Sequence, residues 1–382
     1  MIGIKKPLLL FTIYCSLFTI LCGCTATYPQ DKIKESIVRI CKQEYKSDVL
    51  VETAGRTMVI YLPLSDLMDF SFALSKAASE KINDVIFSAA RVALSTDARI
   101  DFYCVIAHDI KMPELQIIII KSVEDVKRLF ANDISRGEYM KRMLIDLRWS
   151  PQAKKEQVVK EIFNKMNLDP KWQDQVMADF FRSEPTSLGD IGYWGSKFYI
   201  KDITLAEFLA EQIANRVKLE FREDKSLKES FLLKSAKGVY ISKKGKRLFR
   251  FEAFAERSAT GTAGTIEDSD KIFETVLSVA AHVIHGYHFK DHDGVEVFDQ
   301  KEGRSIEVDP EELEAFRTKR LKLNEIGRYI RTAYCVQRLR STHDAIRSTK
   351  YYYREANNGC GELQDGSDER RIRAWLGGAG QN

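Results

Sequence analysis

The sequence predicts an α+β fold built from repeated helix-strand-strand units. Four times along the chain, apolar residues at helical spacing are followed by two short runs that are typical of strands. The four units fall into two pairs, and several helix-start signals lie between the pairs. We therefore expect two antiparallel-sheet subdomains, each covered by two helices, joined by a helical middle region.

The first pair of units occupies residues 24–122, after the N-terminal signal segment. One helical stripe runs from Ile33 to Cys41 and the other from Ile82 to Leu94. Strands are predicted over residues 49–53, 57–62, 100–107 and 115–120. The last of these is apolar throughout, so we expect it near the centre of the sheet.

The helical connector is predicted over residues 123–199. Ser122 with Asp125, and Ser135 with Glu138, have the spacing of a capping box. Ser150-Pro151 and Asp169-Pro170 each place a capping side chain before a proline that suits the first turn of a helix. Four helix starts are therefore expected in this region.

The second pair of units occupies residues 200–316. Its strands are predicted over residues 231–233, 239–241, 248–254, 295–298 and 305–308. The first two of these are expected to be separated by a turn at Lys237-Gly238, because glycine commonly marks turns. Residues 317–382 are expected to form a basic helical segment that ends in a disordered tail.

The composition indicates a globular body that carries little net charge. The 382 residues are 44% hydrophobic and 30% charged, which is enough apolar material for a sizeable core. A net charge of +4 is too small to imply a polyanionic partner for the whole chain. Eleven Lys or Arg residues stand between Arg317 and Arg354, but we expect a solvated helix there and no nucleic-acid partner.

The first 24 residues have the pattern of an export signal. Lys5 and Lys6 precede an uncharged run from Pro7 to Leu21, which ends in Leu21-Cys22-Gly23-Cys24. This ending resembles the lipobox of bacterial lipoproteins. The resemblance implies cleavage before Cys24 and a diacylglycerol on its thiol, and Thr25 favours the outer membrane. The alternative is an uncleaved signal anchor, and both interpretations place the body outside the cytoplasm, in the cell envelope.

Four cysteines remain after the signal, namely Cys41, Cys104, Cys335 and Cys360. Their spacing matches no set of zinc ligands. Cys41 and Cys104 stand on the apolar faces of a predicted helix and a predicted strand. We expect both to be buried thiols rather than a disulfide, because cysteine on an apolar face is ordinarily a core residue.

One cluster of potential metal ligands occurs in the chain. It comprises His282, His285, His288, Asp291, His292 and Asp293. His282 and His285 are three residues apart and share a helix face, and imidazole with carboxylate suits zinc. Two simpler interpretations remain open, namely favourable contact of histidines with a helix C-terminus and a pH-sensitive surface patch.

The sequence contains no motif that specifies a reaction. The nucleophile elbow, the phosphate-binding loop, the paired-cysteine motif and the zinc-protease motif are all missing from it. We expect a lipid-anchored, non-catalytic binding or structural component of the envelope, with a membrane and an unknown envelope protein or polymer as partners. No resident cofactor is expected. The alternative is a zinc-binding module or a metal-dependent hydrolase that uses the His282 to Asp293 cluster.

Overall fold

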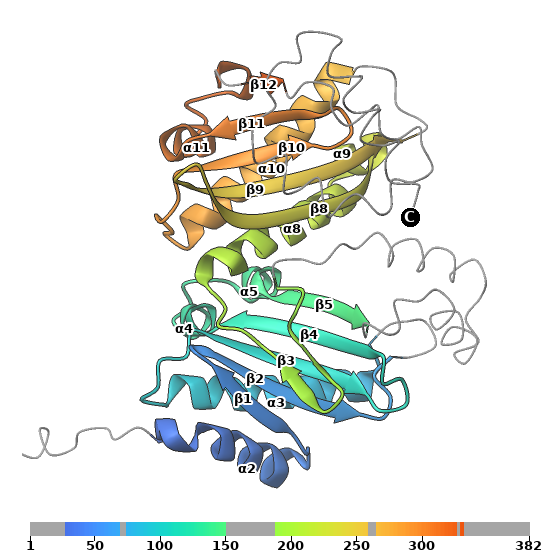
Figure 1. The fold of residues 1–382 in the computed structure, drawn as a ribbon, viewed down its shortest axis with the longest axis vertical. Coiled ribbons are helices and arrows are strands. Elements are labelled where there is room, and N and C mark those ends of the chain that lie inside the picture. The colour runs from blue at the N-terminus through green and yellow to red at the C-terminus, as the bar shows by residue number, and fades with distance from the viewer. Residues whose placement is uncertain (1–26, 69–73, 150–187, 259–264, 327–328, 332–382) are drawn as a thin grey trace, which may run out of the picture. The chain divides into compact units, whose positions relative to one another are not determined.

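The computed structural model describes residues 27–68, 74–149, 188–258, 265–326 and 329–331 (Figure 1). Several predictions lie outside these residues: the lipobox with Cys24, the helix starts at Ser150 and Asp169, Cys335 and Cys360, and the basic segment beyond residue 331. Among the helices that are described, none has the length and apolarity needed to cross a bilayer.

The first subdomain is a five-stranded sheet with helices packed against it (Figure 1). Its helical elements are η1 (Gln30–Lys32), α2 (Ile33–Tyr45), α3 (Lys76–Leu94), α4 (Val123–Phe130) and α5 (Arg136–Arg142). Its strands are β1 (Leu50–Ala54), β2 (Thr57–Leu64), β3 (Phe102–Asp109), β4 (Leu115–Ser122) and β5 (Leu144–Trp149). The strands lie in the sheet in the order in which they occur in the chain.

The second subdomain repeats this topology. Its helical elements are α8 (Leu205–Glu223), α9 (Lys225–Ser230), α10 (Thr265–Gly286), α11 (Pro310–Arg317) and η2 (Leu323–Glu325). Its strands are β8 (Phe231–Lys243), β9 (Lys246–Arg257), β10 (Gly294–Asp299), β11 (Arg304–Val308) and β12 (Tyr329–Arg331), again in chain order. A hairpin of β6 (Gly192–Trp194) and β7 (Lys197–Tyr199) precedes it.

The predicted α+β class, with four helix-strand-strand units in two sheets, is confirmed. The expectation of wholly antiparallel sheets is wrong at one position in each sheet. β2 pairs with β3 in parallel, and β9 pairs with β10 in parallel. The reason is that α3 and α10 are crossover helices, which return the chain to the end of the sheet from which the preceding strand started.

The connector that the sequence predicts to be helical also contributes a strand. Ser135 caps α5 as expected, because its hydroxyl accepts the Glu138 N–H at 3.1 Å. Ser122 precedes α4 without a side-chain capping bond. The chain then pairs β5 with β4, so the first sheet extends beyond residue 122.

The first sheet is covered on both faces. Met58 and Ile60 of β2 belong to the apolar cluster under α2 and α3, whereas Val59 and Tyr61 belong to the cluster that contains α8 and α10. This alternation follows from the two-residue period of a strand. All eight residues of β4 are buried, as expected of an interior strand, although the middle strand of the sheet is β3 and β4 lies between β3 and the edge strand β5.

Gly238 does not form the turn that the sequence predicts. The two short strands expected on either side of it are a single strand, β8, with a bulge between Leu233 and Ser235. A Cβ atom at residue 238 would overlap the carbonyl oxygen of Ala210 in α8 and lie 2.7 Å from a ring carbon of Phe251. Glycine is therefore required because the helix backbone packs directly on the strand.

Cys41 and Cys104 are buried free thiols, which confirms the expectation. Burial raises the pKa of the Cys104 thiol to about 12. Burial also raises the pKa of Cys41, although a hydrogen bond with Ser88 opposes the shift. Neither thiol is poised for nucleophilic chemistry, because the reactive species is the thiolate.

We predict that Gly238→Ala will lower the free energy of unfolding by about 2–3 kcal/mol, because the added methyl group forces α8 away from β8. Urea denaturation monitored by circular dichroism measures the change. Gly137→Ala is the matched control. Its nearest neighbour would be Ser135 Oγ at 3.9 Å, and alanine suits a helix interior, so stability should stay equal or rise. If the two variants have the same free energy of unfolding, the backbone of α8 does not pack as closely on residue 238 in solution.

Candidate functional site

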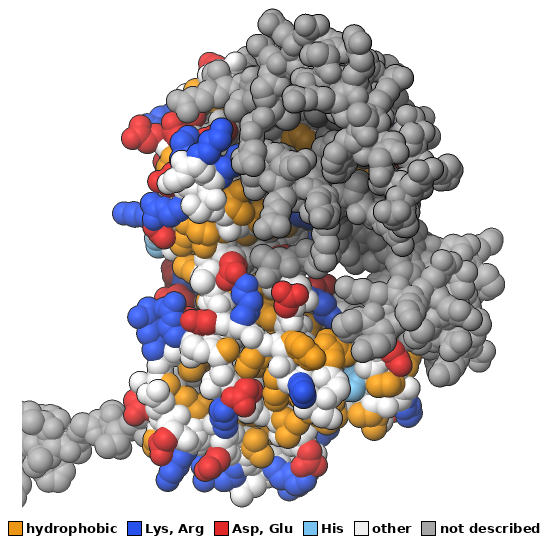
Figure 2. Space-filling model, in the orientation of Figure 1, with side chains coloured by type: hydrophobic (Ala, Val, Ile, Leu, Met, Phe, Trp, Pro, Cys, Tyr) orange, Lys and Arg blue, Asp and Glu red, His pale blue; other side chains and the backbone are white. Residues whose placement is uncertain are grey.

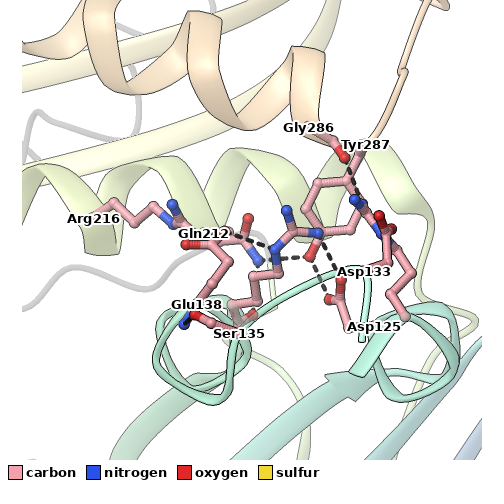
Figure 3. Close-up of polar contacts among 10 residues, drawn as sticks. Asp125, Asp133, Ser135, Glu138, Gln212, Arg216, Gly286 and Tyr287 are labelled. Carbon is pink, nitrogen blue, oxygen red and sulfur yellow. Dashed lines mark hydrogen bonds and ion pairs between the residues drawn. The ribbon is translucent and has the colours of Figure 1, made fainter. Parts of the chain in front are cut away.

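The most extensive buried polar cluster joins the two subdomains, and we call it the junction network. Figure 3 shows side chains from α4 and α5 of the first subdomain meeting side chains from α8 and the end of α10 in the second. The members of the network are Asp125, Arg128, Glu138, Arg142, Gln212, Arg216, Gly286 and Tyr287.

Arg142 occupies the centre of the junction network and is only 6% exposed. Its Nη1 donates to Asp125 Oδ1 at 2.9 Å, and its Nε donates to Glu138 Oε1 at 2.8 Å. Its guanidinium also lies 4.6 Å from the centre of the Tyr287 ring, within the range of a cation–π contact. Two carboxylates and an aromatic face therefore surround one buried cation.

The second subdomain completes this arrangement. Gln212 Nε2 donates to the backbone oxygen of Arg142 at 2.7 Å and to the Tyr287 hydroxyl at 3.0 Å. That hydroxyl in turn donates to Asp125. Arg216 Nη2 donates to Glu138 Oε1 at 2.7 Å. Two arginines thus balance two carboxylates, as buried charges require.

A third arginine, Arg128 of α4, binds the end of α10. Arg128 Nη1 donates to the backbone oxygen of Gly286 at 2.6 Å. The last carbonyl groups of a helix have no partner within the helix and form the negative end of its dipole. A cation at this position satisfies one of them, so the first subdomain supplies a cap for a helix of the second.

The pKa shifts in the network reflect burial opposed by pairing. Burial raises the pKa of Asp125, and the hydrogen bonds from Tyr287 and Arg142 offset only part of this effect. Burial alone would raise the pKa of Glu138 and lower that of Arg142. At Glu138, hydrogen bonds from Arg216 and Arg142 outweigh the effect of burial and lower the pKa. At Arg142, hydrogen bonds to Asp125 and Glu138 outweigh the effect of burial and raise the pKa.

The sequence does not predict the junction network. In the sequence, the spacing of Asp125 and Glu138 indicates only helix capping. One signal was available: Gln212 stands three residues after Leu209 and four after Phe208, so a polar side chain occupies the apolar face of α8. A buried amide needs partners, and here the partners come from both subdomains.

The predicted metal ligands divide into four groups. His285 and His288 have ring centres 6.0 Å apart, and His285 Nδ1 lies 3.6 Å from Glu314 Oε2. His282 is exposed and bonds the backbone oxygen of Ser278, one turn earlier in α10. Asp291 and Asp293 both pair with Arg247.

His292 is the fourth group and lies apart from the other histidines. It is 8% exposed and packs against Phe249 and Phe289, and neither ring nitrogen has a hydrogen-bond partner in the described structure. Among the described residues, which include all six predicted ligands, no group of three or more His, Cys, Asp or Glu is placed to share one ion. A metal shell here would have to displace Arg247 from both carboxylates.

A small cavity also lies at the junction. It has a volume of about 160 Å³, and residues of β3 and α4 line it together with Leu205 and Tyr287. Sites for small molecules usually measure about 300–1,000 Å³. The cavity is therefore smaller than a typical substrate site.

Comparisons with known proteins give no relative for this chain. No family of proteins, no curated protein and no solved structure matches it.

We predict that Arg142→Leu will lower the free energy of unfolding at pH 7 by about 3–5 kcal/mol, because it leaves the buried carboxylate of Asp125 without its cation. The loss should shrink as the pH falls towards 5. The pKa of Asp125 is already raised, removal of Arg142 raises it further, and a group with a raised pKa in the folded state stabilises that state as it becomes protonated. Urea denaturation across this pH range measures both effects.

The control for this variant is Arg222→Leu. Arg222 is 70% exposed and pairs only with the adjacent Glu223 at 3.5 Å. Its replacement should change stability by less than about 0.5 kcal/mol. A loss at Arg142 as small as the loss at Arg222 would show that the network contributes nothing in solution.

We predict that His292→Leu will reduce the sensitivity of the fold to acid. Burial lowers the pKa of His292, with Asp293 opposing and Arg247 reinforcing the shift. Its neutral form therefore stabilises the folded state above the unfolded pKa of about 6.5, and this stability is lost as the pH falls. Urea midpoints between pH 7.5 and 5 should fall less for the variant than for the wild type. The control His282→Gln, at an exposed position, should follow the wild type; parallel curves for all three proteins would refute the assignment.

Proposed function

We propose that this chain is a membrane-tethered, non-catalytic structural or binding component of a bacterial envelope. The observation that carries the proposal is the junction network, in which ionisable side chains of both subdomains are engaged with one another. Catalytic acids and bases must instead reach a substrate. The tether is the lipidated Cys24 implied by the lipobox.

The duplicated topology suits a structural role. The two subdomains share their strand order and the position of their parallel strand pair, and a common apolar cluster includes residues of both. A single lipid anchor would thus hold two similar sheets at the membrane. The alternative, a metal-binding module or hydrolase at the His282 to Asp293 cluster, has no comparable support, since Arg247 engages both carboxylates.

We predict that Cys24→Ser will abolish lipid attachment and leave the signal uncleaved. Intact-mass spectrometry of the membrane-extracted protein should give a mature chain that begins at Cys24 with a diacylglycerol in the wild type. The variant should retain Met1 and carry no lipid. A wild-type protein that retains Met1, or a Cys24 without lipid, would replace the lipid anchor with a signal anchor.

The partner can be sought with the same protein. Chemical cross-linking of intact envelopes, followed by purification of the wild type and of the Cys24→Ser variant, identifies what the body contacts. A component of the envelope that is cross-linked by the wild type supports a structural role. A hydrolytic activity that survives purification, and is lost when one acidic or histidine residue is replaced, would overturn it.

A further inference from the structure

Residues 27–32, which precede α2, are the part of the described chain nearest in sequence to the proposed anchor. Thr27 stands three positions after Cys24, and Lys32 stands eight positions after it. Fully extended, these segments span at most about 11 Å and 29 Å. With lipid on Cys24, Thr27 therefore stays within about 11 Å of the lipidated residue and Lys32 within about 29 Å, so the start of α2 can reach the headgroups of the bilayer.

A groove of about 410 Å³ opens on the surface at this position. Thr27, Pro29, Lys32, Glu35, Ser36 and Arg39 line it. The spacing of Lys32, Glu35 and Arg39 places them along one side of α2. Their side chains are exposed, whereas Ser36 is 4% exposed. The groove thus has two cations and one carboxylate around a hydroxyl.

The surrounding surface carries charges of both signs, and most of them are already paired. Figure 2 shows blue and red side chains side by side along the lower edge of the view, where α2 lies in Figure 1. On α2, Lys34 pairs with Glu52, Lys42 with Asp48, and Glu44 with Arg91. Within the described part of the chain, Lys32, Glu35 and Arg39 have no ion-pair partner, so the groove keeps its charges available for a ligand.

We propose that this groove binds the headgroup of a phospholipid that carries both a phosphate and a primary ammonium group. Lys32 and Arg39 bind the phosphate, and Glu35 binds the ammonium. The one carboxylate of the groove matches the one ammonium group of the lipid. The two cations of the groove exceed the single phosphate by one, and the excess positive charge suits a bilayer surface. The inference rests on the proposed anchoring, because the anchor is what brings the groove to the bilayer. The groove then fixes which face of the first subdomain lies on the membrane.

The test uses the full-length protein, extracted from membranes and reconstituted into lipid nanodiscs. Discs of phosphatidylcholine alone are compared with discs that contain phosphatidylethanolamine or phosphatidylglycerol. Hydrogen exchange of the backbone amides of residues 27–45 is the measurement. We expect phosphatidylethanolamine to slow this exchange roughly tenfold relative to phosphatidylcholine, and Lys32→Ser with Arg39→Ser to remove the difference.

The matched control is Lys218→Ser with Lys228→Ser, which removes two exposed cations from the second subdomain. It should retain the full slowing. Equal exchange in all three kinds of disc would overturn the proposal. Slowing by phosphatidylglycerol as large as that by phosphatidylethanolamine would also overturn it, in favour of simple attraction to anionic lipid.

Mass spectrometry of the same sample separates the two levels of the argument. A Cys24 without lipid, together with slowing by phosphatidylethanolamine, would remove the lipid anchor and leave the groove. A lipidated Cys24 without slowing would leave the anchor and remove the groove.

Discussion

The buried cation at Arg142 is the constraint on which the contact between the two subdomains depends. A guanidinium cannot lose its proton in a protein, so burial obliges the structure to supply anions and acceptors around it. The anions, Asp125 and Glu138, come from the same subdomain as Arg142. Asp125 also accepts a hydrogen bond from the hydroxyl of Tyr287, which belongs to the second subdomain. Moving one subdomain by a few ångströms would leave a charge without its partner. A buried ion pair of this kind contributes less to stability than to the choice of a single arrangement.

The apolar core reinforces this choice. Residues of β2, β3 and β4 alternate between a cluster under α2 and α3 and a cluster shared with α8, α10 and the second sheet. The first sheet is therefore buried on both faces, which explains why β4 has isoleucine at the four successive positions 117–120. The second sheet differs, because its strand β9 has one apolar and one polar face. Phe249 and Phe251 face the core. Arg250 and Glu252 lie on the opposite face and form an ion pair with each other at 3.1 Å. The first sheet is therefore buried on both faces, whereas the second sheet has a polar face.

Much of this fold could be predicted from periodicity alone, because the helices and strands with a strong apolar pattern are amphipathic or fully buried. The sequence predicts a turn at Gly238 because the local sequence around a glycine does not distinguish a turn from a place where a neighbouring backbone packs closely. The parallel strand pairs depend on the path of a crossover helix, which no local pattern encodes. The junction network joins residues up to 162 positions apart, as with Asp125 and Tyr287, and buried charges carry no periodic signal. The histidines show the reverse case, since their close spacing along the chain is undone by the turn at His288, where φ is 52°.

A duplicated sheet raises the risk that its units continue to add to one another edge to edge. The outer strand β8, as far as the second sheet is described, has features that oppose this. It carries Lys234, Lys237 and Lys243, and a bulge interrupts it between Leu233 and Ser235. Lysines and bulges on an edge strand hinder pairing with another chain, because the charge would have to lose its water and the bulge breaks the register. These features make pairing of another strand with this edge unfavourable.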